Sequence, residues 1–235
     1  MAYEDGVLRY DGVTWSLIEL PDQQKAYWVT SNDIGEIFVG ANGDFGILRP
    51  SKDQSDIIYH TLTDLLPDHY KDFNVVWEVV ATSNGITFRS RKYLFQYNDG
   101  EIQAFDVPSG GARFDAAYPA RESVFFRVYG LGLASLDKDG LKVLPGSEFF
   151  AEKKVNGIYA YGSDQLLVAT RFEGLFLYSE KEIVQFQTEA DEYLIKNKIY
   201  DGHHLSNGNY AIATMANGLI IITPQGTEVM RFDSS

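Results

Sequence analysis

The stretch at residues 164–186 decides the fold, and it reads DQLLVATRFEGLFLYSEKEIVQF. It holds three short apolar runs, at residues 166–169, 175–178 and 183–186. Each run is too short for a helix and is ended by a turn signal, such as the Glu173-Gly174 step before the second run. The stretch therefore predicts an antiparallel meander of short β-strands.

The same pattern recurs along the whole chain. A glycine followed by an aliphatic residue opens an apolar run five times, and the intervals between these glycines are 40, 86, 42 and 44 residues. The longest interval spans two repeats, and in it Tyr93-Leu94 takes the place of the glycine step. A period near forty residues with four short strands is typical of propeller blades; a β-sandwich with coincidental hairpins is the alternative. The steps are Gly6-Val7, Gly46-Ile47, Gly132-Leu133, Gly174-Leu175 and Gly218-Leu219.

The repeat predicts an all-β fold, a single β-propeller over residues 1–235 built from four-stranded antiparallel blades. Five blades are complete, and residues 6–20 form a half blade that lacks its two inner strands. The last apolar run is an outer strand, so it does not supply the missing inner ones. Because a propeller normally closes by pairing strands from both ends in one blade, we expect a partial propeller that belongs to a longer chain.

Composition excludes several kinds of partner. The chain has 33 acidic and 20 basic residues, a formal net charge of −13, which argues against nucleic-acid binding because phosphate contacts need a basic surface. It has no cysteine, which excludes disulfides and thiolate metal sites. The sequence shows neither a long apolar span nor the basic and apolar regions of a signal peptide, so we expect no membrane segment.

Catalytic motifs are not found. The four histidines are His60, His69, His203 and His204, and their spacing matches no metal-binding motif; adjacent residues on a strand point to opposite faces, so His203 and His204 do not share a metal. Asp137-Lys138-Asp139-Gly140 is predicted as a hairpin turn rather than a calcium loop. The sequence thus predicts no catalytic residues, metal or cofactor. A propeller lyase or hydrolase using acids such as Asp191 and Glu192 is the least favoured alternative.

Recognition is predicted in the turns that join the second and third strands of successive blades, since these turns lie on one face. The turns combine planar donors with aromatic rings, the mixture that holds sugars and carboxylates. The structural alternative is that the arginines pair with nearby acids and that Phe172 packs on the next blade. Trp28 and Trp77 are predicted to pack in the core. The candidate ligand-binding residues are Asn42, Asp44, Arg91, Tyr129, Arg171 and Phe172.

Four stretches resemble the propeller-repeat sensor domain of bacterial two-component regulators, the group that includes hybrid histidine kinases and triple-tyrosine-motif regulators. They are GVLRYDGVTW from Gly6, NGDFGIL from Asn42, VWEV from Val76 with Ala81-Thr82, and TEADEYL from Thr188. In that family the repeats precede a β-sandwich domain and a kinase or DNA-binding output, none of which follows in this sequence.

The resemblance implies a periplasmic or extracellular sensor domain that binds a carbohydrate or another small molecule. Its other partners would be the remaining blades and the output domains of the same protein, and any kinase activity would lie outside this segment. The alternative from a different class is a protein-interaction scaffold with no small ligand. The longer links at residues 63–74 and 188–197 are expected to hold a helical turn each and to rise above the same face.

Overall fold

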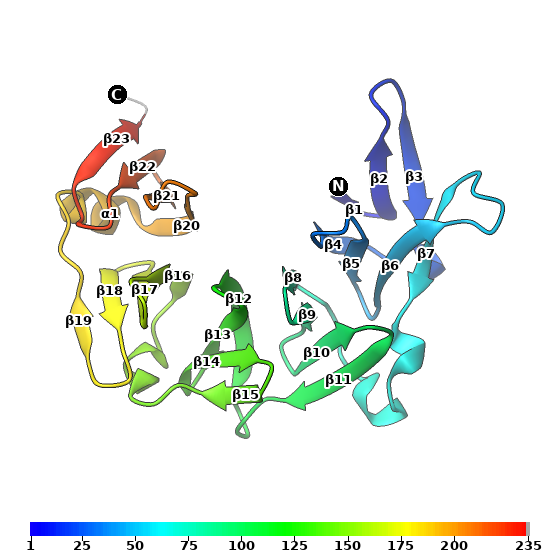
Figure 1. The fold of residues 1–235 in the computed structure, drawn as a ribbon, viewed down its shortest axis with the longest axis horizontal. Coiled ribbons are helices and arrows are strands. Elements are labelled where there is room, and N and C mark those ends of the chain that lie inside the picture. Colours follow the sequence, from blue (N-terminus) through cyan, green and yellow to red (C-terminus); the bar gives the residue numbers. More distant parts are fainter. Residues whose placement is uncertain (234–235) are drawn as a thin grey trace. The chain divides into compact units, whose positions relative to one another are not determined.

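The computed structural model describes residues 1–233 as a succession of antiparallel sheets (Figure 1). The chain divides into two compact units, Met1–Ala117 and Tyr118–Ser235. In every sheet the strands follow one another in chain order. This meander is the arrangement predicted from residues 164–186, and it differs from the Greek-key order of a β-sandwich.

The first unit contains three sheets. The first has three strands and the next two have four each. Strands β4 and β8, each the first strand of its sheet, contact one another, as the inner strands of neighbouring blades do. The strands are β1 (Ala2–Tyr3), β2 (Gly6–Tyr10) and β3 (Trp15–Glu19); β4 (Ala26–Ser31), β5 (Ile37–Ala41), β6 (Phe45–Pro50) and β7 (Ile57–Thr61); β8 (Glu78–Thr82), β9 (Gly85–Arg89), β10 (Tyr93–Asn98) and β11 (Glu101–Asp106).

The second unit also contains three sheets, each with four strands, and the boundary between the units falls within β12. First strands β16 and β20 contact one another. The strands are β12 (Arg113–Ala120), β13 (Ser123–Tyr129), β14 (Gly132–Asp137) and β15 (Gly140–Val143); β16 (Val155–Tyr161), β17 (Gln165–Thr170), β18 (Gly174–Tyr178) and β19 (Ile183–Gln185); β20 (Ile199–His204), β21 (Tyr210–Thr214), β22 (Leu219–Ile222) and β23 (Glu228–Phe232).

The N-terminal sheet differs from the prediction by one strand. The sequence indicated only β2 and β3, but β1 pairs with β2 through Ala2↔Val7 and Tyr3↔Gly6. The Met1 ammonium and the Leu8 N–H extend this ladder by bonding each other's carbonyls, both at 2.9 Å. A two-residue strand shows no periodicity that a sequence pattern could reveal. The sheet therefore lacks one strand of a complete blade, not two.

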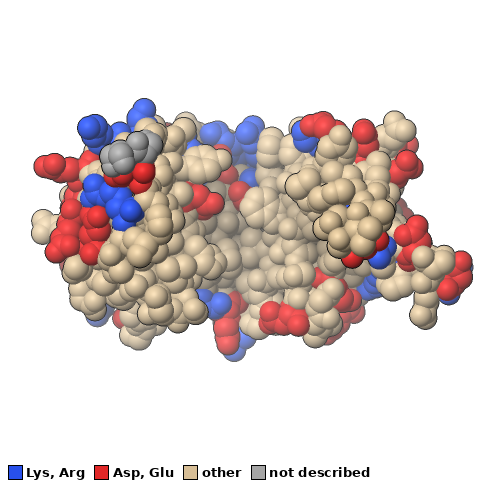
Figure 2. All heavy atoms as spheres, turned by 90° about the horizontal axis from the view of Figure 1, so that it is seen from above, with Lys and Arg blue, Asp and Glu red and all other residues tan. Residues whose placement is uncertain are grey.

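Charged side chains of both signs lie side by side on the C-terminal unit (Figure 2, left). The Arg231 guanidinium, for example, pairs with the Glu228 carboxylate. Such mixing matters in a chain with a formal net charge of −13, because local basic groups can still receive an anion where acids do not neutralise them.

Within residues 1–233, no helix is both long enough and apolar enough to cross a membrane.

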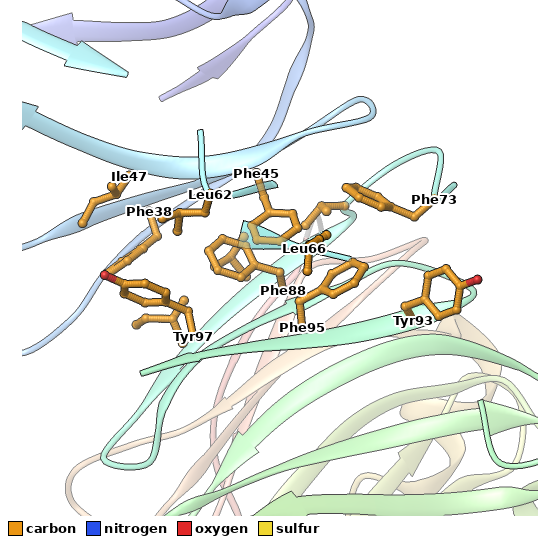
Figure 3. Close-up of a cluster of buried hydrophobic side chains, with 13 residues drawn as sticks. Phe38, Phe45, Ile47, Leu62, Leu66, Phe73, Phe88, Tyr93, Phe95 and Tyr97 are labelled. Atoms are coloured by element: carbon orange, nitrogen blue, oxygen red, sulfur yellow. The ribbon is translucent and has the colours of Figure 1, made fainter. Parts of the chain in front are cut away.

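Aromatic residues fill the space between the second and third sheets of the first unit (Figure 3). The ring of Phe45, on β6, lies 4.4 Å from that of Phe88 and 5.0 Å from that of Phe95, centroid to centroid. Phe38 and Tyr97 extend the cluster, with their centroids 5.8 Å apart. Side chains of alternate strand residues point to one face, so each sheet contributes a row of rings to the interface between the two sheets.

The long links contain the expected helical turns. Residues Thr63–Leu65 and Asp68–Tyr70 form 3-10 turns in the first unit, and further 3-10 turns lie at Pro21–Gln23 and Ser147–Phe150. In the second unit, helix α1 (Asp191–Asn197) precedes β20.

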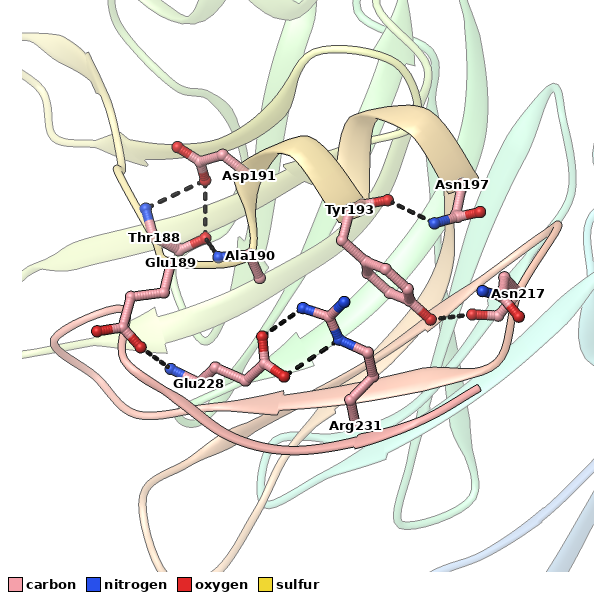
Figure 4. Close-up of polar contacts among 9 residues, drawn as sticks. All are labelled: Thr188, Glu189, Ala190, Asp191, Tyr193, Asn197, Asn217, Glu228 and Arg231. Atoms are coloured by element: carbon pink, nitrogen blue, oxygen red, sulfur yellow. Dashed lines mark hydrogen bonds and ion pairs between the residues drawn. The ribbon is translucent and has the colours of Figure 1, made fainter. Parts of the chain in front are cut away.

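Hydrogen bonds attach α1 to the last sheet (Figure 4). Its first turn is closed by the Thr188 hydroxyl, which donates to the Asp191 carboxylate at 2.7 Å. The Glu228 N–H donates to Glu189 at 2.9 Å, and the Arg231 guanidinium lies 4.3 Å from the Tyr193 ring. Of the two adjacent acids named for the hydrolase alternative, Asp191 and Glu192, Asp191 therefore has a structural role at the start of the helix.

Candidate functional site

Five of the six residues predicted to bind ligand lie in turns between the second and third strands of a sheet, and Tyr129 is the last residue of β13, directly before such a turn. In the first unit these turns join β5 to β6 and β9 to β10; in the second they join β13 to β14 and β17 to β18. Asn42, Asp44 and Arg91 belong to the first unit. Tyr129, Arg171 and Phe172 belong to the second unit.

A buried hydroxyl builds the turn that presents Arg91. Ser90 is 2% exposed, and its Oγ accepts the N–H groups of Lys92 at 3.2 Å and Tyr93 at 2.8 Å. The same hydroxyl donates to the Tyr93 carbonyl at 2.9 Å. Because Ser90 satisfies the polar groups of the turn from inside, the next side chain, Arg91, is left to face outward.

Thr170 builds the corresponding turn in the second unit. Its hydroxyl donates to the Gly174 carbonyl at 2.9 Å and accepts the Glu173 N–H at 3.2 Å. Gly174 has φ of 85°, a conformation that glycine adopts without strain. Arg171 thus follows its hydroxyl residue as Arg91 follows Ser90, and the sequence places an arginine at equivalent positions in two blades.

A cavity of about 240 Å³ lies beside Arg91 in the first unit. Its wall includes Trp77, Arg91 and the link at residues 72–75. The Arg91 guanidinium lies 5.4 Å from the Trp77 ring centroid, close enough for a cation–π contact. The Tyr27 ring meets Trp77 edge-on, with centroids 5.1 Å apart. The cavity therefore joins an aromatic surface to a planar cation.

Lys92 adds a second cation to the cavity wall. Its ammonium lies 3.0 Å from the Asp72 carboxylate and 4.8 Å from the Tyr93 ring centroid. Contact with the Tyr93 side chain and then with Asp72 raises the pKa of Lys92. The lysine is therefore a cation at neutral pH, and Asp72 partly neutralises it. The guanidinium of Arg91, in contrast, contacts a ring rather than a carboxylate.

The prediction that Trp28 and Trp77 pack in the core is wrong. Trp28 is 42% exposed and Trp77 is 36% exposed. A shift of register between Ala26 and Trp28 marks a bulge in β4, and a bulge re-aims the side chains that follow it. Beside Trp77 the core position is taken by Val76, which is fully buried.

The other two candidates of the first unit differ in their accessibility. Asp44 is 5% exposed, and its Oδ1 accepts hydrogen bonds from the hydroxyls of Thr61 at 2.6 Å and Thr63 at 2.9 Å. These contacts give Asp44 a part in holding the turn. Asn42 is exposed and forms a backbone bridge with Val75, a residue of the cavity wall. The fold thus brings Asn42 and Arg91 to the same link.

In the second unit the predicted residues share a different neighbourhood. Phe172 is 51% exposed, and the Lys198 ammonium lies 5.9 Å from its ring centroid. Arg171 is half-buried, and its Nε is buried with no hydrogen-bond partner among the described residues. Tyr129 is half-buried with the Arg127 guanidinium 5.0 Å from its ring. Aromatic rings and cations therefore occur together here too.

Sequence reasoning missed much of the cavity wall. Trp77 was assigned to the core, and Asp72 and Lys92 were not assigned to the ligand site. The sequence feature that could have identified the wall is the position of residues 72–77 directly before β8, the first strand of its sheet. This position places them beside the turn at residues 90–92 of the same sheet.

Within residues 1–233, no group of three or more acidic or histidine side chains is arranged to hold a metal ion.

Comparisons with solved structures establish the fold class. The structure of a streptogramin B lyase matches with a TM-score of 0.62 at 14% identity, over 88% of this chain and 68% of that one. A chain of the mitotic checkpoint complex matches with a TM-score of 0.62 at 11% identity, over 100% of this chain and 76% of that one. Neither a protein-family model nor a curated protein matches the sequence.

A third similar structure is the extracellular domain assigned to a one-component system of B. thetaiotaomicron. It matches with a TM-score of 0.53 at 12% identity, and the match covers 97% of this chain but 39% of that domain. At identities this low the likeness concerns the fold. Together with the four-stranded meanders, it defines the chain as an all-β protein of the β-propeller class.

Proposed function

We propose that this chain is the ligand-binding propeller segment of a bacterial sensor protein, and that it binds a small acidic sugar in the cavity beside Arg91 and Trp77. The contact between the Arg91 guanidinium and the exposed Trp77 ring carries the proposal. A ring of this kind receives the apolar face of a sugar, and a guanidinium receives a carboxylate through paired hydrogen bonds.

The size of the cavity favours a small ligand. Its volume of about 240 Å³ lies below the roughly 300–1,000 Å³ of pockets that take drug-sized molecules. One sugar ring with a carboxylate suits this space better than a long oligosaccharide held along its whole length. Asn42, at the edge of the same link, supplies an amide for a sugar hydroxyl.

The sensor role and an extracellular or periplasmic location are supported by two observations. Four stretches of the sequence resemble sensor propellers of two-component regulators, and one structure of similar fold is the extracellular domain of a one-component system. In this proposal, ligand binding to the propeller changes the activity of output domains elsewhere in the protein.

A thermal-shift experiment tests the proposed ligand. Glucuronate and galacturonate are compared with glucose and galactose, because each pair differs by the carboxylate. A ligand that binds only the native state raises the melting temperature, so we expect the two uronates to raise it more than the neutral sugars. Arg91→Ala should abolish the additional rise with the uronates, whereas Arg9→Ala, which removes an exposed arginine of β2, is the matched control and should leave it unchanged.

Equal shifts with acidic and neutral sugars would contradict the role of Arg91 in recognising a carboxylate. No shift with any of the four sugars would contradict the sugar-binding proposal and leave the protein-interaction scaffold as the better interpretation. Cleavage of a disaccharide that contains either uronate would instead support the lyase or hydrolase alternative, because free monosaccharides have no glycosidic bond to break.

A further inference from the structure

A second hollow lies in the C-terminal unit, at the other end of the strands from the candidate ligand turns. It is a groove of about 230 Å³ formed by the ends of three first strands, β12, β16 and β20. The carbonyl of Arg171 bonds the N–H of Ile199, which begins β20, whereas the groove takes the last residues of that strand, Gly202, His203 and His204. The two sites are therefore distinct.

The shape of the groove depends on a glycine. A Cβ atom at Gly202 would lie 2.4 Å from the Tyr159 hydroxyl, much closer than atoms can approach. Tyr159 is 7% exposed and also borders the groove. Only glycine therefore fits beside this buried ring, and its missing side chain leaves the groove open between the two strands.

Basic groups border the groove. Arg121, His203 and His204 belong to its lining, and in the described part of the chain this lining includes no carboxylate. This composition contrasts with a formal net charge of −13 for the whole chain. The nearest acid along β20, Asp201, accepts the Gly202 N–H through its Oδ1 at 2.8 Å, so this carboxylate already bonds the backbone.

The basic groups are held in place. The Arg121 Nη2 donates to the carbonyls of Gln165 at 2.9 Å and Tyr161 at 3.4 Å. The His204 ring stacks on Tyr210, with centroids 4.8 Å apart and an angle of 17° between the planes. Fixed donors lose little conformational freedom when they receive a ligand, which favours binding.

We propose that this groove is a second binding site, specific for a small anion that carries a carboxylate or a phosphate. Arg121 supplies the permanent positive charge, and His204, which lies on the same face of β20 as Gly202, supplies a hydrogen-bond donor. The inference does not depend on the proposed sugar site, because it uses different residues at the opposite ends of the strands.

The four histidines provide a direct test by NMR. The chain is titrated at pH 7 and constant ionic strength with inorganic phosphate and, separately, with acetate, while the imidazole signals are followed. We expect a saturable shift of the His204 signal with at least one anion. His60 and His69, in the first unit, serve as internal controls and should not move.

Two variants complete the test. Arg121→Gln should weaken binding about tenfold, the loss expected for one charge-assisted contact, whereas Lys181→Gln removes an exposed charge away from the groove and should change nothing. Saturation by phosphate alone or by acetate alone would assign the anion class. The proposal is overturned if neither anion saturates, if all four histidines shift together, or if folded Arg121→Gln binds as tightly as the unchanged chain.

Discussion

The turns that present Arg91 and Arg171 have the same construction but different surroundings. In each, a buried hydroxyl residue precedes the arginine, and the arginine carbonyl accepts an N–H from the first strand of the next sheet, that of Phe114 at 3.0 Å or Ile199 at 3.1 Å. Beside Arg91 lies a cavity of about 240 Å³ with Trp77 in its wall. Beside Arg171 lie an exposed ring, Phe172, and the ammonium of Lys198.

This comparison separates what the repeat determines from what it leaves open. The position of the arginine is set locally, by the hydroxyl residue before it and the strand pairing on either side. The ability to enclose a ligand depends on a link distant in sequence, residues 72–77, which differs from blade to blade. A propeller can therefore keep one scaffold and change ligand by changing its inter-blade links.

The residue that precedes the hydroxyl residue of each turn gives the largest expected effect on stability. Arg89 is 3% exposed, and its guanidinium bonds the Glu78 carboxylate at 2.5 Å and the Phe114 carbonyl at 2.9 Å; the residue before Thr170 is the apolar Ala169. Arg89→Ala should lower the free energy of unfolding by about 3 kcal/mol, because it leaves a largely buried carboxylate without its partner. Urea denaturation measures the loss.

A double variant provides the control for that experiment. Replacing both partners, as in Arg89→Met with Glu78→Leu, should recover part of the lost stability because no charge is then left buried. If Arg89→Ala unfolds with the same midpoint as the unchanged chain, the Arg89–Glu78 ion pair does not stabilise the fold. The difference between Arg89 and Ala169 would then have no energetic consequence.

The hydroxyl residues give the next effect. Ser90 satisfies two N–H groups and Thr170 satisfies one. Ser90→Ala should therefore cost about 2 kcal/mol and Thr170→Val about 1 kcal/mol. Chemical denaturation of both variants checks the order. Equal losses would show that the number of bonds at the turn does not set its stability.

The exposed rings give the smallest effect on stability and the clearest one on function. Phe172 is 51% exposed, so Phe172→Ala should change the free energy of unfolding by less than about 1 kcal/mol. Trp77 is 36% exposed, so Trp77→Ala should cost somewhat more, about 1 kcal/mol, because more of its ring is buried. Only Trp77→Ala should abolish the uronate-induced rise in melting temperature. Loss of that rise in Phe172→Ala alone would move the sugar site to the second unit.

Much of the fold could be predicted because its signals are local. Steps such as Gly46-Ile47 and Gly218-Leu219 open third strands, and the turns at residues 42–44 and 90–92 lie where the repeat predicted them. The two-residue strand β1 escaped detection because it is held by pairing with β2 rather than by any pattern of its own.

The candidate site was less predictable because its contacts are distant in sequence. The burial of Asp44 depends on hydroxyls 17 and 19 residues further along, at Thr61 and Thr63. The exposure of Trp28 follows a bulge in β4 that no residue pattern announced. Charge and residue type therefore led to Arg91 as a candidate, and the structure places it in a turn between a second and a third strand, whereas its aromatic neighbour Trp77 could be identified only from the structure.

Isothermal titration calorimetry with glucuronate on two arginine variants tests the proposed sugar site most directly. We expect Arg91→Ala to abolish measurable binding. We expect Arg171→Ala, the equivalent change at the turn without the Trp77 cavity, to retain it within about twofold, less than about 0.5 kcal/mol. Undiminished binding by folded Arg91→Ala would contradict the assignment of the site to the Trp77 cavity.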